Sequence, residues 1–486
     1  MNFSVIKRTI GYILLFESVF FFVPMITAAC YWEKEFFSFL ICSGICAALG
    51  GLCMLGKSKR LDFYAKEGFV TVALSWIVIS IFGSLPFIIS GAIPNFIDAL
   101  FETVSGFTTT GSTILTGERI DNMAKSLLIW RSFTHWVGGM GVLVFVMAFL
   151  PLSGARNLHM MQAESTGASV SKLVPKVRHT AIILYGIYFA MTILQFILLL
   201  CGGIPVFDAL NIAFATAGTG GFSITSSGML EYSSYIQIVT TVFMFLFSIN
   251  FASYYLALRG KIKDALNTEV KAFLLIVIFA VAGITLNLCL TDGYIGSTFA
   301  SEGDALKHSA FAVASVISTT GFATVDFNLW PSLSKIILLA LMFVGACAGS
   351  TGGGMKVSRH LVLFKGAKHE VRRMIHPKQI KKITLDGKVV EHEVVRSINA
   401  YLVAFILVFV ASLLLVSIDG KSVETTFSAV TATINNIGPG LGEAGPYGSF
   451  TSFSWLSKLV FIFDMLAGRL EIFPMLILFS PATWKK

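Results

Sequence analysis

The sequence predicts an all-α integral membrane protein in which four repeated units surround a common axis. The composition is the first reason, because hydrophobic residues make up 55% of the 486-residue chain and charged residues only 13%, whereas soluble domains carry about a quarter charged residues. The second reason is that long apolar runs alternate with short basic segments. The third reason is that four glycine-centred segments recur at similar intervals, which is typical of internal repeats.

The composition and motifs also exclude several classes of protein. The formal net charge is +9, but the basic residues lie between apolar runs, as in membrane proteins, so nucleic-acid binding is not expected. The seven cysteines form no CxxC pair and no cluster with histidine, so neither a disulfide framework nor a zinc site is expected. The chain contains no HExxH motif and no visible nucleophile–base pair, so it is not expected to be an enzyme.

Ten apolar runs approach the length of about 20 residues that a helix needs to cross the hydrocarbon core. The first run follows Lys7 and Arg8 without a clear cleavage pattern, so we expect a retained helix and not a signal peptide. About ten transmembrane helices are therefore expected, and an even number places both termini on the same side. The runs lie near 10–29, 37–56, 69–91, 126–151, 180–202, 235–258, 271–291, 334–364, 398–418 and 455–480.

The connections between these runs alternate in charge. The basic connections are 57–67, 151–179, 259–271 and the longest polar stretch, 365–396. The positive-inside rule places them, and both termini, in the cytoplasm. We expect the 365–396 loop to contact either a regulatory partner or anionic lipid headgroups. The other connections carry acidic residues instead, namely Glu102, Glu118, Asp208, Asp292, Glu302, Asp304 and Glu424.

Four outward connections share a pattern that ordinary loops lack. Each has about ten small or weakly apolar residues, then threonine or asparagine, then glycine, and the four glycines lie 110, 100 and 117 residues apart. Ten to fourteen residues are too few to span, which favours a re-entrant half-helix followed by a loop. The segments are DALFETVSGFTTTGST from Asp98, DALNIAFATAGTGGFS from Asp208, FAVASVISTTGFA from Phe311 and SAVTATINNIGPG from Ser428, which align Gly111, Gly221, Gly321 and Gly438.

Each unit is therefore a span, a pore half-helix, a loop and a second span, and the four units are expected to be related by pseudo-four-fold symmetry about an axis along the membrane normal. Non-helical backbone at membrane depth must line a cavity or be buried in protein. Four converging loops would offer rings of carbonyl oxygens that suit a cation. The predicted boundaries are 1–60 for a two-span extension and 61–155, 156–265, 266–395 and 396–486 for the repeats.

Two further features interrupt the apolar runs. The eighth run contains GACAGSTGGGMK at 345–356, with five glycines in twelve residues, which cannot sustain a helix interior. Arg469 lies within the last run, where a charge is costly unless it faces the bundle interior or water.

Several motifs together resemble the Trk/Ktr/HKT superfamily of potassium transporters, most closely its bacterial TrkH type. The resemblance covers essentially the whole chain. It implies potassium uptake across a bacterial cytoplasmic membrane, a homodimer with one pore per subunit, and a cytoplasmic nucleotide-binding regulatory ring as partner. The two spans before residue 60 are also expected for this type. The motifs are TTTGS, GTGGFS, STTGFA, NNIGPGLGE, WRSFTHWVGGMG (130–141), GACAGSTGGGMKVSR (345–359) and AGRLEIF (467–473).

The resemblance also implies site residues. K+ would bind in a selectivity filter at Thr109, Thr110, Gly111, Thr219, Gly220, Gly221, Thr319, Thr320, Gly321, Asn436, Ile437 and Gly438. The implied gate beneath it consists of Gly345, Gly349, Gly352, Gly353, Gly354, Lys356 and Arg469. Glycine in all four loops matches the potassium-selective members, although the loops lack TVGYG, so a simpler and less strict filter is expected.

Some alternatives stay open at the level of sequence. Arg469 could instead pair with Glu471 or Asp464 without a gating role, and Lys356 is expected to extend to the cytoplasmic surface. His135 could be a proton site, although packing is favoured. A proton- or sodium-coupled symporter remains the alternative function, although no intramembrane acidic pair stands out. The chain has no GxGxxG motif and no organic cofactor is expected, so nucleotide would act through a partner.

Overall fold

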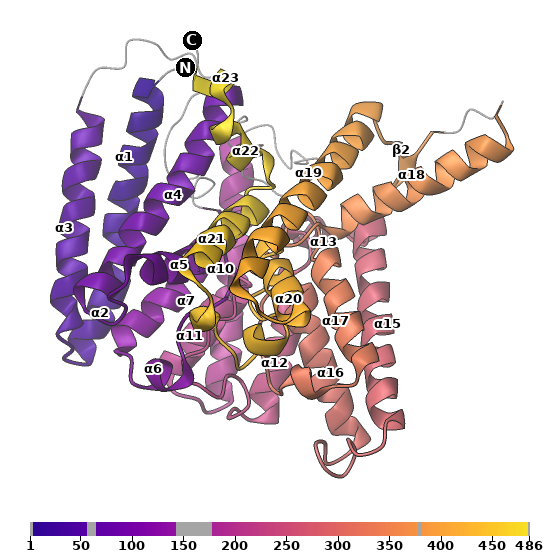
Figure 1. Ribbon diagram of the computed structural model, residues 1–486, viewed down its shortest axis with the longest axis horizontal. Coiled ribbons are helices and arrows are strands. Elements are labelled where there is room, and N and C mark those ends of the chain that lie inside the picture. Colours follow the sequence, from indigo (N-terminus) through magenta and orange to yellow (C-terminus); the bar gives the residue numbers. More distant parts are fainter. Residues whose placement is uncertain (1–2, 56–64, 142–176, 378–381, 485–486) are drawn as a thin grey trace.

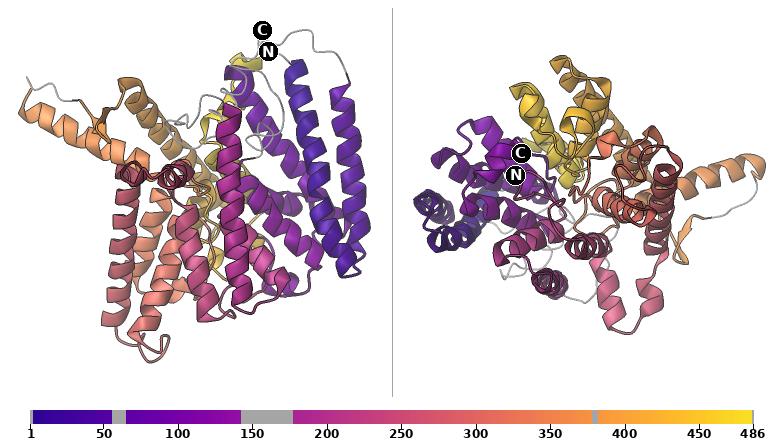
Figure 2. Two further views of the ribbon diagram at one scale, coloured as in Figure 1. Left: turned by 180° about the vertical axis from the view of Figure 1, so that it is seen from behind. Right: turned by 90° about the horizontal axis from the view of Figure 1, so that it is seen from below.

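The computed structural model describes residues 3–55, 65–141, 177–377 and 382–484, and the fold is almost entirely helical (Figure 1). Seen end-on, purple, magenta, orange and yellow segments follow one another around a common centre (Figure 2, right). This order along the chain is the arrangement expected for repeats related by an axis through the middle of the molecule.

Six helical stretches of the described residues are long and apolar enough to cross a membrane, and a seventh is obtained when the bent pair α12 (Ser234–Phe247) and α13 (Phe251–Leu258) is counted as one. The multi-span prediction is therefore confirmed, whereas the number ten stays a prediction. The continuation of the 126–151 run beyond residue 141 lies outside the described residues. The six stretches are α1 with α2 (Phe3–Phe20, Phe22–Cys30), α3 (Glu35–Met54), α4 (Ala65–Ile89), α10 (Val177–Cys201), α15 (Thr268–Leu290) and α19 (His392–Val416).

The predicted spans 235–258 and 455–480 are interrupted helices. The pair α12 and α13 is bent by 92°, and the Asn250 side chain at the bend accepts a hydrogen bond from the Ala252 amide at 2.8 Å. The last run divides into α21 (Trp455–Arg469) and α22 (Phe473–Phe479). Between them Glu471 and Ile472 have φ of 59° and 67°, a left-handed backbone that cannot continue a helix.

The 334–364 run and the 365–396 loop need correction. Helix α17 (Ser332–Val344) ends at the glycine-rich segment, and α18 (Val357–Ile375) then runs well past residue 364 and away from the bundle (Figure 1). A hairpin of β1 (Thr384–Leu385) and β2 (Lys388–Val389) follows. The polar stretch is thus largely ordered, because α18 is amphipathic and Asp386-Gly387 suits a tight hairpin turn.

The first three helices pack against the outside of the first repeat. Helices α1 and α3 approach closely at Gly11 and Gly50, where a methyl carbon added to either glycine would lie 3.0 or 2.9 Å from the carbonyl oxygen of the other. The Ser18 and Ser43 hydroxyls each donate to the other residue's carbonyl, at 2.9 and 3.0 Å. Small residues and paired hydroxyls are the usual means of helix association in membranes.

Four shorter helices, α5, α11, α16 and α20, lie inside the bundle and are largely buried. They span Phe96–Phe107, Val206–Ala217, Glu302–Ile317 and Val423–Ile434. Three of them are 12 residues long and α16 has 16 residues, so all are short for a bilayer crossing, as a re-entrant half-helix must be. The predicted repeat boundaries near 60 and 155 fall outside the described residues, and the boundary at 395/396 falls inside α19.

The remaining described elements are short or connect these helices. They are α6 (Gly117–Asp121), α7 (Lys125–Gly139), α14 (Ile262–Ala265), η1 (Phe327–Leu329), η2 (Ser417–Asp419), η3 (Gly442–Ala444), η4 (Phe450–Ser452) and α23 (Pro481–Trp484).

Candidate functional site

All four half-helices stop at the same distance from their loop glycine. Helices α5, α11, α16 and α20 end at Phe107, Ala217, Ile317 and Ile434, each four residues before Gly111, Gly221, Gly321 or Gly438. The glycine alignment made from the sequence therefore corresponds to a structural alignment of helix ends. Each half-helix directs its carboxyl end, which carries partial negative charge, toward the loop that follows it.

The four loops also share one backbone conformation. Two residues before each glycine, φ is 56° at Thr109, 56° at Thr219, 61° at Thr319 and 55° at Asn436. A positive φ is unfavourable for a β-branched residue such as threonine, and such strain persists only where the surrounding structure imposes it. The next amide donates back to the half-helix at 2.9 Å in all four loops, the pairs being Thr110–Ser105, Gly220–Ala215, Thr320–Ser315 and Ile437–Ala432.

The loops contact one another in a closed ring. A methyl carbon added to Gly111 would lie 1.9 Å from the carbonyl oxygen of Gly220, and one added to Gly221 would lie 1.9 Å from that of Thr320. A methyl carbon added to Gly321 would lie 2.4 Å from the carbonyl oxygen of Ile437. One added to Gly438 would lie 2.8 Å from that of Thr110, which closes the ring at the first loop. Each glycine therefore leaves room for the neighbouring loop, which a side chain would displace.

A cavity of about 270 Å³ lies on one side of this ring. All four loop glycines line it, together with residues such as Arg131. Beside its outer loops, the Lys421 ammonium and the Ser452 hydroxyl hydrogen-bond the Glu443 carboxylate and hold its pKa below the usual value. An ionised carboxylate therefore lies close to the outer mouth of the site.

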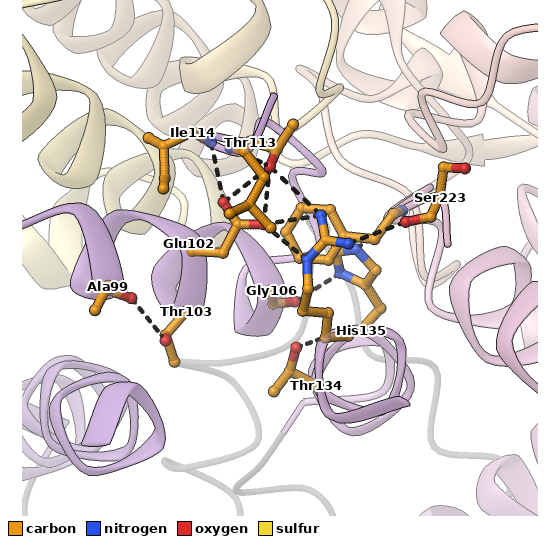
Figure 3. Close-up of polar contacts among 12 residues, drawn as sticks. Ala99, Glu102, Thr103, Gly106, Thr113, Ile114, Thr134, His135 and Ser223 are labelled. Carbon is orange, nitrogen blue, oxygen red and sulfur yellow. Dashed lines mark hydrogen bonds and ion pairs between the residues drawn. The ribbon is translucent and has the colours of Figure 1, made fainter. Parts of the chain in front are cut away.

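A buried ion pair supports the first two loops and was missed by sequence reasoning. Arg131 and Glu102 approach to 2.8 Å with both side chains almost fully buried. The Glu102 carboxylate also accepts from the Thr113 hydroxyl and the Ile114 amide (Figure 3), while Arg131 donates to the Ser223 carbonyl at 2.9 Å. Glu102 is thus not an exposed outward acid. The available signal in the sequence was Arg131, the second residue of WRSFTHW, because a charge within an apolar run is costly unless it is paired.

His135 lies behind the second loop with both ring nitrogens in use. Its Nδ1 lies 2.8 Å from the Gly106 carbonyl (Figure 3), and the Phe222 amide donates to its Nε2 at 3.3 Å. These contacts assign the neutral tautomer with the proton on Nδ1. The ring packs on Phe222 with centroids 4.2 Å apart, so the structure favours the packing interpretation over a proton site.

The glycine-rich segment 345–356 lies directly against the third and fourth loops. The Gly353 amide donates to the Thr319 hydroxyl at 2.6 Å, and the Gly354 amide donates to the Asn435 carbonyl at 3.0 Å. A methyl carbon added to Gly352 would lie 2.8 Å from the Ser318 carbonyl oxygen. Three of the five predicted gate glycines therefore contact the ring from the side opposite the cavity.

The other two gate glycines shape the segment and do not touch the ring. Gly345 and Gly349 have φ of 69° and 75°, and the Gly349 carbonyl accepts from the Phe251 amide at the bend between α12 and α13. Glu269, at the start of α15, accepts from the Ala348 amide at 2.7 Å and the Ser358 amide at 3.1 Å. Sequence reasoning missed this acid, which connects both ends of the segment.

Arg469 joins the ring to the segment below it. One guanidinium nitrogen donates to the Thr109 hydroxyl at 3.1 Å and to the Thr351 carbonyl at 2.9 Å. The other donates to the carbonyls of Gly138 and Gly139 at the end of α7. A positive charge therefore lies directly beneath the first loop.

Glu471 and Asp464, which the sequence suggested as ion-pair partners of Arg469, have other partners. Glu471 forms an ion pair with Arg359 in the first turn of α18. Asp464 accepts a hydrogen bond from the Ser412 hydroxyl at 2.7 Å. Neither ion pair proposed from the sequence forms, because Arg469 points toward the loops while Glu471 lies on a reversed backbone beyond the helix end.

Lys356 does not extend to a surface, contrary to the sequence prediction. Its side chain is buried, and its ammonium donates to the Gly352 carbonyl within the same segment. The backbone has φ of 74° at this residue, which turns the side chain back under the segment.

Comparisons with known proteins agree on one family. The model of the TrkH family, described as cation transport protein, matches residues 35–486. The chain is 34% identical to the Trk system potassium uptake protein TrkH of Halomonas elongata over 494 residues, and 32% identical to that of Escherichia coli strain K12 over 493 residues, covering all of each chain. The crystal structure of the potassium transporter TrkH from Vibrio parahaemolyticus superimposes with a TM-score of 0.89 at 33% identity, again over both whole chains.

Proposed function

Because the chain belongs to the TrkH family of cation transport proteins, we propose that it takes up potassium ions through the ring of four loops. Like its relatives, it is a transporter and not an enzyme, and it is a multi-pass membrane protein. The observation that carries the proposal is the closed ring, in which every loop glycine faces a carbonyl oxygen of the next loop.

The ring supplies what a desolvated cation needs. Backbone carbonyl oxygens can replace the hydration shell of potassium. The carboxyl ends of four half-helices add partial negative charge at the same place. The twelve predicted filter residues form the four loops concerned, so K+ is proposed to bind among their carbonyls and to enter from the cavity lined by the four glycines.

Arg469 and the segment 345–356 are proposed to close this path from below. The guanidinium contacts both Thr109 in the first loop and Thr351 in the segment, so a cation leaving the ring would meet a fixed positive charge. The backbone of Gly352–Gly354 occupies the space beneath the third and fourth loops. Opening would require the segment to move, and its glycines give the backbone that freedom.

The orientation and the partners are part of the proposal. The basic connections favour a cytoplasmic location for both termini and for α18. The name of the relatives, a Trk system protein, supports assembly with other components. We propose a homodimer in a bacterial cytoplasmic membrane whose gate is controlled by a cytoplasmic nucleotide-binding ring.

A proton- or sodium-coupled symporter remains the second candidate, and one observation favours it. Glu17 in α1 is completely buried, and neither of its carboxylate oxygens has a hydrogen-bond partner among the described residues. Its Oε1 lies 3.2 Å from the position of a methyl carbon added to Gly83, which itself would contact Phe107 at the end of α5. A carboxyl behind a pore half-helix could carry a proton during transport.

Rubidium uptake into proteoliposomes tests the proposal. The wild-type protein is expected to show uptake that potassium inhibits and sodium does not. Gly321→Ser should lose this discrimination, because its added atoms would lie 2.4 Å from the Ile437 carbonyl oxygen and distort the ring. Dependence of uptake on an imposed proton gradient, abolished in Glu17→Gln, would favour the symporter. Uptake with equal sodium and potassium inhibition in both proteins would contradict the proposed filter.

A further inference from the structure

A second cavity lies far from the ring, between α18 and the β1–β2 hairpin. Its volume is about 230 Å³, and five basic side chains and a histidine line it, namely Lys365, Lys368, His369, Arg372, Arg373 and Lys382, with no acidic side chain among its lining residues. A cavity of this size and charge is suited to a phosphate group.

The hairpin and α18 hold this cavity together. The Lys365 ammonium donates to the Thr384 carbonyl at 2.8 Å, which fixes the hairpin against the helix. Arg373 forms an exposed ion pair with Glu370 at 3.6 Å. Within the described part of the chain, Lys368, Arg372 and Lys382 have no acidic partner, so three positive charges face the cavity uncompensated.

The hairpin lies at the level of a membrane surface. Asp386 in its turn accepts hydrogen bonds from the backbone amide and the hydroxyl of Thr268, at 2.7 and 2.5 Å. Thr268 is the first residue of α15, an apolar span of 23 residues. Such a helix is roughly 35 Å long and matches a hydrocarbon core of about 30 Å. Its first residue, Thr268, therefore lies near the boundary between hydrocarbon and headgroups. The cavity lies near the same boundary, because Thr384, which lines it, is two residues from Asp386.

Helix α18 presents an apolar stripe beside the basic cavity. Phe364, Val371 and Ile375 follow one another at helical spacing and are 71%, 57% and 65% exposed. Lys365, Lys368 and Arg372 occupy the adjacent face. Figure 1 shows that α18 projects sideways from the bundle, and the Ser358 amide at its start donates to Glu269 in the first turn of α15. Helices with neighbouring apolar and basic faces lie in the membrane interface, with the basic side chains at the phosphates.

We infer that this cavity binds the phosphate of an anionic phospholipid, with the acyl chains against the apolar stripe of α18. A soluble phosphate compound would account for the basic cavity alone. An acidic protein surface would leave the apolar stripe beside it unexplained. The lipid accounts for the charge, for the stripe and for the level set by the Asp386–Thr268 hydrogen bonds. The inference needs only that the chain spans a membrane, and it stands or falls independently of the proposed filter and gate.

Lipid binding to the full-length protein tests the inference. Native mass spectrometry would count phosphatidylglycerol and phosphatidylcholine molecules retained by the detergent-purified protein at physiological ionic strength, which screens diffuse attraction. The test variant replaces Lys368, Arg372 and Lys382 by glutamine. The matched control replaces Lys261, Lys263 and Lys271, which are exposed on the same side of the chain but line no part of the cavity, by glutamine.

The wild-type protein and the control are expected to retain phosphatidylglycerol in preference to phosphatidylcholine. The cavity variant should bind phosphatidylglycerol roughly a hundredfold more weakly, because each basic residue near an anionic headgroup contributes about fivefold. Equal losses in both variants would show diffuse attraction and overturn the inference. So would full displacement of the lipid by millimolar inorganic phosphate, which would identify a soluble phosphate site. Unchanged lipid binding in a cavity variant that has lost only binding of a partner protein would also overturn it.

Discussion

At the scale of single residues, the site depends on the absence of four side chains. Gly221 and Gly438 have φ of 70° and 99°, and each faces a carbonyl oxygen of the next loop. A left-handed backbone costs an ordinary residue about 1–2 kcal/mol before any collision is counted. The glycines are therefore required both by their own conformation and by their neighbours.

The collision distances predict a graded response to alanine. An added methyl carbon would lie 1.9 Å from a carbonyl oxygen at Gly221 but 2.8 Å at Gly438. Gly221→Ala should reduce rubidium uptake by about an order of magnitude or more, since a barrier higher by about 1.4 kcal/mol already lowers a rate tenfold. Gly438→Ala should have the smaller effect at equal protein in the membrane. Equal loss in both variants would show that the distances do not determine tolerance.

The buried ion pair of Arg131 and Glu102 is expected to contribute to the stability of the folded protein, because neither charge is solvated. Glu102→Gln leaves the guanidinium buried without its carboxylate, which typically destabilises a protein by about 3–5 kcal/mol. The thermal unfolding midpoint in detergent should fall clearly for this variant. The exposed pair of Lys335 and Glu424 provides the control, because Glu424→Gln should shift the midpoint little. Similar midpoints for both variants would contradict the structural role assigned to Glu102.

At the scale of elements, interruptions of helices form the site. Segment 345–356 separates α17 from α18, and the reversed backbone at Glu471 and Ile472 separates α21 from α22. Arg469 is the last residue of α21, and its guanidinium donates a hydrogen bond to the Thr351 carbonyl in segment 345–356. The two breaks therefore meet beneath the ring, where an unbroken pair of helices would leave no movable backbone.

Removal of the Arg469 charge should open the path. Arg469→Ala is expected to raise basal rubidium uptake by about an order of magnitude or more, because two unit charges a few Å apart in an effective dielectric of about 20 repel by several kcal/mol. Arg469→Lys keeps the charge and should stay close to the wild-type rate. Uptake into proteoliposomes without any partner measures both. An unchanged rate in Arg469→Ala would remove the guanidinium from the gate.

At the scale of the whole molecule, the proposed orientation follows from charge. Helix α18 and the hairpin carry basic residues, whereas the cavity above the ring opens among uncharged loops with Glu443 beside it. The positive-inside rule assigns these two ends to opposite sides of the membrane.

Labelling with a membrane-impermeant thiol reagent checks this orientation. The seven native cysteines, which include the exposed Cys30 and Cys201, would first be replaced by serine. Lys388→Cys should then be labelled only in inverted vesicles, and Ser449→Cys only in right-side-out vesicles. The opposite result would reverse the proposed direction of the chain in the membrane.

The pattern along the chain was enough to predict the membrane class, the four glycine-centred loops and the TrkH family. Hydropathy runs and glycine-centred motifs involve residues close together along the chain, so they can be recognised without knowledge of the tertiary structure. The ends of α5, α11, α16 and α20, four residues before each glycine, agree with that prediction.

Only the tertiary structure decided which groups meet. Arg469 reaches Thr109 across 360 residues of chain and not its near neighbour Glu471, Lys356 folds inward, and Glu102 is buried with Arg131. The same holds for Asp386, which places the hairpin at the start of α15. Such partners are chosen by the packing of distant helices and by the direction of each side chain around its helix, and neither is contained in spacing along the chain.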